Sequence, residues 1–134
     1  MGGTTLRSRR GFTLIEMIIV ISIIAILVAI AVPIYTQHLR RAKEAVLKED
    51  LYSMRSSIDQ YTQDKNKAPQ QLDDLVTAGY LHAIPKDPFT NSSDTWQVVN
   101  EDIVLALDQS QPGITDVHSG SDQISSEGTA YNTW

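Results

Sequence analysis

The sequence predicts an α+β fold, with one long N-terminal helix, a small antiparallel β-sheet and an ordered C-terminal loop. Three observations lead to this prediction. Residues 17–34 are apolar except for Ser22, the stretch that follows carries apolar residues at helical spacing, and the segments 96–99 and 103–107 are typical of short strands. A chain of 134 residues without cysteine excludes a large multidomain enzyme, a disulfide-stapled mini-protein and a thiolate metal site.

The apolar stretch 12–34 is predicted to cross a membrane. It is about 23 residues long, and about 20 apolar residues are enough for a helix to span a hydrocarbon core of roughly 30 Å. A cleaved secretory signal is the alternative, but Tyr35, Gln37 and His38 follow where a processing site with small residues would lie. We therefore expect a retained membrane helix, followed by a globular domain at residues 35–134.

Charge is distributed unevenly along the chain. Arg7, Arg9 and Arg10 precede the apolar stretch, whereas residues 42–134 hold 15 Asp and Glu against 6 Lys and Arg. Because basic residues beside a membrane helix favour the cytoplasmic side, we expect the short N-terminal tail inside the cell and the acidic domain outside. Phosphate binding relies on clustered Lys and Arg, so the acidic domain argues against nucleic acid as a partner.

An apolar stripe continues the helix beyond the membrane segment. Spacings of four, three, four and three separate its members, which are Leu47, Leu51, Met54, Ile58 and Tyr61. The helix is predicted to run from near Thr13 to about Asp64, and Pro33 within it is expected to kink it or melt it locally. The charged residues of the opposite face are expected to be solvated, with Glu44 and Lys48 spaced for an exposed ion pair: Lys43, Glu44, Lys48, Glu49, Asp50, Arg55 and Asp59.

Shorter elements complete the predicted domain. Residues 70–78 are predicted to form a second helix with Gly79 as its C-cap, and its inward side chains are Leu72, Leu75 and Val76. The strands 96–99 and 103–107 are predicted to pair as an antiparallel hairpin around a turn at 100–102.

The N-terminal motif identifies a family. Residues 9–17, Arg-Arg-Gly-Phe-Thr-Leu-Ile-Glu-Met, resemble the cleavage and methylation signal of type IV pilins and type II secretion pseudopilins. The resemblance implies a leader at residues 1–11, cleavage between Gly11 and Phe12 by a membrane-embedded prepilin peptidase, and N-methylation of Phe12. It also implies a pilin-like fold, in which the sheet lies across the C-terminal half of the long helix. Such a subunit has a single pass in the bacterial inner membrane and a periplasmic globular domain.

Glu16 is a carboxylate inside the apolar stretch. An ionised group in hydrocarbon costs several kcal/mol unless it is paired or reaches water at the membrane edge. Cleavage before Phe12 creates a terminal ammonium, and pairing of this ammonium with Glu16 of a neighbouring subunit offsets much of that cost. The resemblance thus implies that Glu16 is an assembly residue rather than a catalyst. The alternative is a glutamate that only reaches the membrane surface.

The segment 79–89 extends the resemblance to the major pseudopilins of type II secretion. Its Gly-Tyr-Leu and Ile-Pro-Lys-Asp-Pro-Phe runs resemble the loop between the long helix and the sheet in that family, and four side chains are expected to cover the apolar stripe: Tyr80, Leu81, Ile84 and Phe89. The resemblance implies a structural subunit of a helical filament that drives protein export. Its implied partners are copies of itself, minor pseudopilins and an inner-membrane assembly platform.

The C-terminal tail, residues 108–134, is predicted to be an ordered loop. Oxygen-bearing side chains are abundant at 116–122, and calcium tolerates carboxylate and carbonyl ligands in irregular loops. The tail resembles the calcium loop of the major pseudopilin, which implies Asp116, Ser119 and Asp122 as ligands. The alternative is that these residues are solvated or cap turns.

Catalytic motifs are absent from the sequence. His38, His82 and His118 are isolated, and neither a Gly-x-Ser-x-Gly elbow nor a Gly-rich phosphate loop occurs. We therefore predict no enzymatic activity. Two alternatives stay open: a type IV pilin subunit of a surface fibre used for adhesion, twitching motility or DNA uptake, and a membrane-anchored enzyme or sensor. Without cysteine, the chain cannot close its tail by a disulfide, as many adhesive pilins do.

Overall fold

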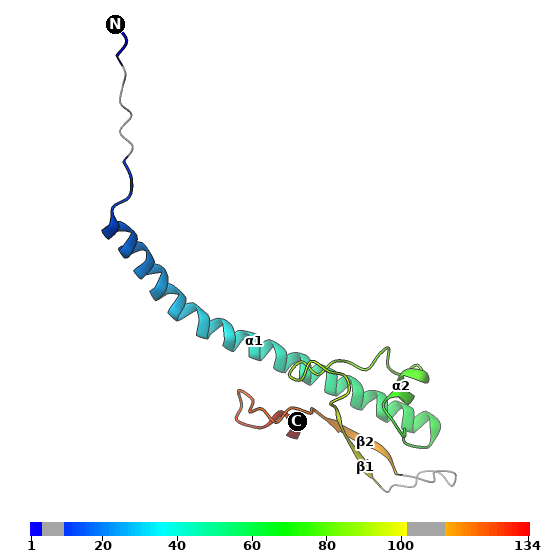
Figure 1. The fold of residues 1–134 in the computed structure, drawn as a ribbon. Coiled ribbons are helices and arrows are strands. Elements are labelled where there is room, and N and C mark those ends of the chain that lie inside the picture. The colour runs from blue at the N-terminus through cyan, green and yellow to red at the C-terminus, as the bar shows by residue number, and fades with distance from the viewer. Residues whose placement is uncertain (4–9, 102–111) are drawn as a thin grey trace. The chain divides into compact units, whose positions relative to one another are not determined.

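The computed structural model describes residues 1–3, 10–101 and 112–134. Its elements in chain order are α1 (Leu14–Lys65), α2 (Asp73–Thr77), β1 (Gln97–Glu101), β2 (Gly113–His118) and a short 3₁₀ helix (Tyr131–Thr133) (Figure 1). One long helix with a two-stranded antiparallel sheet confirms the predicted α+β fold. The chain divides into two compact units, Met1–His38 and Leu39–Trp134, and α1 contributes to both.

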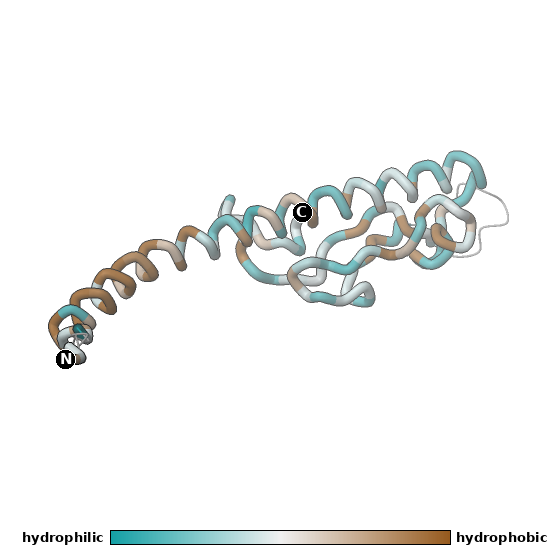
Figure 2. Tube along the Cα trace, turned by 90° about the horizontal axis from the view of Figure 1, so that it is seen from above, coloured by the Kyte–Doolittle hydropathy of each residue, from teal (hydrophilic) through white to brown (hydrophobic). Residues whose placement is uncertain are grey.

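In the first unit, α1 is apolar and exposed. Its start is capped by Thr13, whose hydroxyl accepts a hydrogen bond from the Glu16 N–H at 3.2 Å. Every side chain from Leu14 to His38 is exposed. Figure 2 shows the apolar residues of this part of the helix in brown. The described part of the unit, residues 1–3 and 10–38, therefore buries no core of its own.

Pro33 lies inside α1, and the helix is continuous across it. A proline removes one helical hydrogen bond, whereas the turns on either side keep theirs. In the turn that follows, the Thr36 hydroxyl donates a hydrogen bond to the Pro33 carbonyl at 2.9 Å. The predicted local melting at Pro33 is therefore absent from this structure, and the kink stays a prediction.

The second unit has one core, which is built on the predicted stripe of α1. Leu47, Leu51, Met54 and Ile58 are all buried, so the prediction from their spacing is confirmed. They pack with a set of buried residues from the rest of the unit: Leu75, Trp96, Ile114, Val117 and Tyr131. Full burial of one such aliphatic side chain contributes roughly 1.5–3 kcal/mol, so this shared core is the main stabilising feature of the domain.

The segment after α1 covers the core, largely as predicted. Helix α2 is shorter than the expected 70–78 and buries Leu75. Gly79 follows its C-cap residue, Ala78, with φ +86°, which an L-residue with a side chain rarely adopts. The Tyr80 N–H bonds to the Leu75 carbonyl at 2.9 Å and the Gly79 N–H to the Val76 carbonyl at 3.1 Å, which is a Schellman motif. Leu81, Ile84 and Phe89 then pack partly buried against the core.

The sheet differs from its prediction in its second strand. β1 confirms the strand predicted at 96–99 but continues to Glu101, so the turn predicted at 100–102 is wrong at its first two positions. Its antiparallel partner is β2, in the stretch predicted to be a loop, with Val98 opposite Val117. The strand predicted at 103–107 lies outside the described residues.

A bulge explains why β2 is hard to recognise. The register shifts between Val99 and Asn100, so the strand buries Ile114 and Val117, three positions apart, and the alternation of two residues is lost. Gly113 is required at the start of β2, because a Cβ there would lie 2.2 Å from the Ala68 Cβ. The start of β2 thus lies in close backbone contact with Ala68, in the segment that follows α1.

Candidate functional site

The predicted cleavage junction is an accessible, non-helical segment. Residues 10–13 precede α1, and nothing lies within 4 Å of the position that a Cβ on Gly11 would occupy. Phe12 is also exposed. A protease needs a peptide bond that it can approach outside a helix, and the bond between Gly11 and Phe12 meets that requirement. The cleavage itself stays a prediction.

Glu16 lies in the first turn of α1, where a carboxylate is favoured by the helix dipole. Its main chain bonds to Thr13, but within the described residues no donor or cation lies in bonding distance of its side-chain carboxylate. The surrounding side chains are apolar and exposed, Ile15 and Met17 among them. The geometry therefore leaves the carboxylate available to a group from outside the chain.

The apolar half of α1 is long enough and apolar enough to cross a membrane. Large apolar side chains are exposed around its whole circumference, for example Ile18, Ile19, Val20 and Ile21 on consecutive positions. A helix that is hydrophobic on every face is buried in a membrane or in a large core. This helix therefore needs cover that the described chain does not supply.

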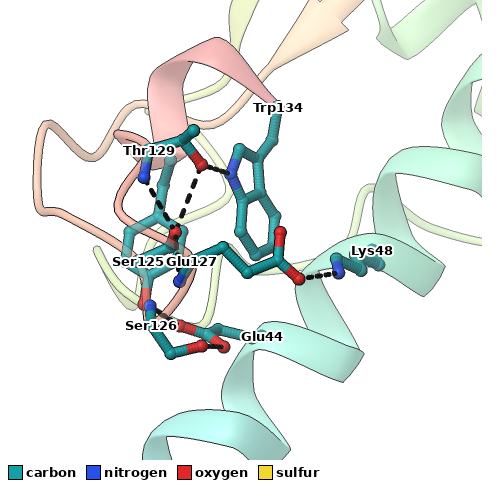
Figure 3. Close-up of polar contacts among 8 residues, drawn as sticks. Glu44, Lys48, Ser125, Ser126, Glu127, Thr129 and Trp134 are labelled. Atoms are coloured by element: carbon teal, nitrogen blue, oxygen red, sulfur yellow. Dashed lines mark hydrogen bonds and ion pairs between the residues drawn. The ribbon is translucent and has the colours of Figure 1, made fainter.

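In the globular unit, Glu44 is a buried carboxylate and not the solvated residue that was predicted. It is 6% exposed and accepts three hydrogen bonds from the tail (Figure 3). The Ser126 N–H and hydroxyl donate at 2.8 and 2.6 Å, and the Tyr131 hydroxyl donates at 2.8 Å. Glu44, Ser126 and Tyr131 form the Glu44 cluster, which holds the tail against α1.

The Glu44 cluster changes the acidity of both of its ionisable members. Burial by itself raises the pKa of Glu44, but the hydrogen bonds from Ser126 and Tyr131 and the charge of Arg40 outweigh burial, so that the pKa is lowered overall. Burial and the bond to the Glu44 carboxylate raise the pKa of Tyr131 to about 12. At neutral pH the cluster therefore holds a carboxylate and a neutral phenol.

Aromatic contacts extend this attachment over the tail. Tyr131 stacks on Phe89 with ring centroids 3.8 Å apart, and Trp134 meets Tyr131 edge-on at 5.1 Å. Lys48 lies over the Trp134 ring at 4.7 Å and pairs with Glu127 at 3.2 Å, so the predicted exposed pair of Lys48 with Glu44 is wrong. The burial of Glu44 under the tail explains why Lys48 finds another partner.

Arg55 also departs from the solvated face on which it was predicted. Its Nε donates to Asp116 Oδ1 at 2.6 Å, and its Nη2 donates to the main-chain oxygens of Val117 at 2.9 Å and Trp134 at 2.7 Å. Burial raises the pKa of Asp116, but the Val117 N–H and the Arg55 guanidinium outweigh it, so that the pKa is lowered overall. This Arg55 cluster joins α1, β2 and the last residue of the tail.

A third polar cluster is centred on Asp87, which is 0% exposed. Its carboxylate accepts hydrogen bonds from the Ser119 hydroxyl, the Gly120 N–H at 3.3 Å and the Phe89 N–H at 2.9 Å. Gly120 is required there, because a Cβ at this position would lie 2.1 Å from the Thr95 carbonyl oxygen. The Asp87 cluster therefore ties the proline-containing loop to the end of β2.

The residues predicted to bind calcium are engaged in different places. Asp116 is held by Arg55, the Ser119 hydroxyl donates to Asp87, and Asp122 is exposed. The Arg55 guanidinium that bonds to Asp116 offsets the negative charge of this carboxylate, which a metal ion would need. No group of three or more His, Asp or Glu residues that could hold a metal occurs within the described ranges. The donor set of Asp116, Ser119 and Asp122 therefore does not fit a calcium ion.

The chain matches a known sequence motif and is similar to several characterised proteins. Residues 6–32 match the prokaryotic N-terminal methylation motif. The chain is similar to type II secretion system core protein G of Aeromonas hydrophila, with 31% identity over 101 residues that cover 63% of this chain and 71% of that protein. For the Pseudomonas aeruginosa protein of the same name, the identity is 34% over 101 residues, with coverage of 63% and 71%. For the Vibrio cholerae protein it is 30% over 101 residues, with coverage of 64% and 69%.

The chain belongs to the type II secretion system core protein G family. This finding confirms the predicted resemblance to type II secretion pseudopilins and the predicted function as a pseudopilin subunit. The names of these relatives refer to a secretion system and to no enzymatic activity, and the absence of an enzymatic activity stays a prediction. The apolar half of α1 fits the membrane anchoring that the sequence predicts. No solved structure matches the chain.

Proposed function

We propose that this chain is the repeating subunit of a helical pseudopilus, held in the bacterial inner membrane before assembly and bundled through its apolar helix afterwards. The observation that supports the proposal most strongly is the exposed apolar half of α1, together with the methylation motif that covers residues 6–32. Such a helix is stable in lipid or among other helices, but not in water. The family favours a secretion filament over the surface pilus that the sequence left open.

The proposed processing step gives the subunit its assembly register. Cleavage after Gly11 leaves Phe12 as an N-methylated terminus, four residues before Glu16. Two unit charges 4 Å apart attract by about 4 kcal/mol at an effective dielectric constant of 20. An ammonium of one subunit that meets the Glu16 carboxylate of the next therefore favours a single axial offset between neighbours. Separation of the pair exposes both charges to hydrocarbon, which opposes disassembly.

The proposed filament carries the second unit on the periplasmic side, in agreement with the basic N-terminal tail and the acidic domain. The hydrogen bonds of the Glu44, Arg55 and Asp87 clusters hold the domain's tail and loops in one arrangement. A fixed domain surface suits the repeated contacts of a polymer. Minor pseudopilins at the tip and an inner-membrane assembly platform are the proposed further partners.

Mass spectrometry and secretion assays on a strain deleted for this chain test the proposal. Complementation with the parent chain is expected to restore protein export and to yield filaments whose subunits begin with N-methylated Phe12. Glu16→Ala subunits are expected to be cleaved normally but to be at least tenfold depleted from filaments. The matched control is Glu49→Ala, an exposed glutamate on the globular half of α1, which is expected to assemble like the parent.

Two outcomes contradict parts of this proposal. Glu16→Ala subunits that enter filaments as efficiently as the parent remove the role of that carboxylate in assembly. Long fibres in sheared cell-surface material, combined with normal secretion in the deletion strain, point to a surface pilus instead of a pseudopilus.

A further inference from the structure

Arg55 bonds to an unusual combination of groups for a residue on an exposed helix face. Its three acceptors are one carboxylate oxygen and two main-chain oxygens, from Asp116, Val117 and Trp134. The Arg55 side chain is 37% exposed, so the guanidinium lies at the edge of the domain with its donors turned inward. These contacts span 61, 62 and 79 residues of sequence, and they close the tail onto α1.

The same acceptors are of the kind that a calcium ion collects. Calcium in an irregular loop takes carboxylate and main-chain carbonyl oxygens, and the ion draws separate segments together. A guanidinium offers five N–H donors in a planar fork and a permanent positive charge, so it can gather oxygens of the same types. In this chain the oxygens converge on a side chain of α1.

The Arg55 guanidinium also opposes binding of a metal at Asp116. Its Nε is 2.6 Å from Asp116 Oδ1, and the Val117 N–H donates to that oxygen at 2.7 Å. On the other carboxylate oxygen, His118 Nε2 lies at 3.5 Å. A divalent cation at Asp116 Oδ1 would have to displace Arg55, and one at Oδ2 would be repelled by the guanidinium at short range.

We propose that Arg55 replaces a metal ion in this domain: its guanidinium closes the C-terminal tail, and the stability of the folded domain does not depend on calcium. The proposal does not depend on the filament function, because it concerns the folded subunit alone. One consequence is that chelation of calcium leaves the subunit folded, so the protein can work where calcium is scarce.

Thermal unfolding of the full chain in detergent micelles, followed by near-ultraviolet circular dichroism, tests this proposal. The parent chain is expected to give the same Tm, within about 1 °C, in excess EGTA and in millimolar calcium chloride. Arg55→Gln is expected to lower the Tm by at least about 5 °C in both solutions, because it removes the guanidinium from Asp116 and takes one donor each from the Val117 and Trp134 main-chain oxygens. The Trp134 oxygen then keeps its contact with His118 Nδ1. Arg41→Gln, at an exposed arginine of the same helix, is the matched control and is expected to stay within about 1 °C of the parent.

Asp116→Asn and the double variant separate an ion pair from a metal site. If Arg55 closes the tail, Asp116→Asn lowers the Tm equally with and without calcium. The two substitutions together then lower it by less than the sum of their separate effects, because they remove one shared interaction. A rise of several degrees in the Tm of the parent on addition of calcium overturns the proposal, and so does an Arg55→Gln variant that melts like Arg41→Gln. If Arg55→Gln does not fold, calorimetric titration of the parent with calcium decides: measurable binding overturns the proposal, and its absence supports it.

Discussion

The two halves of α1 are one continuous helix with opposite relations to the rest of the chain. Between Leu14 and His38 apolar side chains occupy all faces and are exposed, as Ile23 is at 53%. Beyond Leu39 one apolar stripe is buried, as Leu47 is at 0%, and apolar side chains off the stripe, such as Val46 and Tyr52, are exposed. The difference shows that hydrophobicity alone does not locate a core. A narrow stripe indicates a partner within the chain, whereas an all-round apolar surface indicates a partner outside it.

A matched pair of substitutions, one in each half of α1, provides the strongest test of this difference. Leu47→Ala removes a fully buried side chain and is expected to lower the free energy of unfolding of the domain by about 2–5 kcal/mol, since a cavity remains. Ile23→Ala removes a similar apolar side chain in the other half and is expected to leave the free energy of unfolding of the domain unchanged. Urea unfolding of both variants in micelles provides the measurement. Equal losses of stability would show that the two halves do not differ in this way.

The next largest loss of stability is expected in the Glu44 cluster. There a carboxylate on the second half of α1 is hydrogen-bonded by donors from the same chain. Glu44→Ala leaves the Ser126 N–H and the Tyr131 hydroxyl without their acceptor and is expected to cost about 3 kcal/mol. Glu49→Ala, at an exposed position of the same helix, is expected to change stability by less than about 0.5 kcal/mol. The same urea titration compares the two.

The sign of the pH dependence sharpens this prediction. The pKa of Glu44 is lowered from 4.5 in the folded domain, so its contribution to stability is fully present above pH 4.5 and is lost as the pH falls through the lower folded value. Asp50 has the opposite sign, because burial and the charge of Asp87 raise its pKa. Asp50 is present in both the parent and Glu44→Ala, so its contribution cancels in the difference between their free energies of unfolding. That difference is expected to shrink on acidification, and a constant difference down to pH 3 would contradict the assignment.

The smallest effect is expected at Lys48. Its ion pair with Glu127 joins side chains that are 56% and 62% exposed, and its contact with the Trp134 ring is also at the surface. Solvent screens such interactions, so Lys48→Gln is expected to lower stability by less than about 1 kcal/mol. Added salt should reduce even this loss. A loss as large as that of Glu44→Ala would mean that the tail is held from its outer surface.

Periodicity and local motifs made much of this fold predictable. The stripe from Leu47 to Ile58 follows a period that only a helix produces, and the Gly79 stop signal depends on the glycine at one backbone position. The N-terminal motif was predictable for a similar reason, because it is a short, contiguous string with its own chemistry. Such signals do not depend on where distant parts of the chain fold.

The polar clusters could not be predicted, because each joins residues far apart in the sequence. Glu44 and Arg55 look like ordinary charges on a solvated helix face until the tail covers them. Asp87 lies between two prolines, which concealed its role in holding Ser119. The only local hint is that the tail places its aromatic residues Tyr131 and Trp134 among polar ones, and that signal indicates burial without naming the partner. β2 was missed because its bulge disrupts the alternation of a strand.

The Glu44 cluster also sets an order of events during synthesis and folding of the polypeptide. Glu44 leaves the ribosome early, whereas its donors Ser126 and Tyr131 are 82 and 87 residues further along the chain. Closure of so long a loop carries a large entropic cost and comes late in folding. Until residue 131 has arrived, the helix carries a carboxylate without its donors and a stripe without its cover. A subunit truncated before that residue thus keeps an uncovered apolar stripe and a carboxylate that lacks the Tyr131 donor.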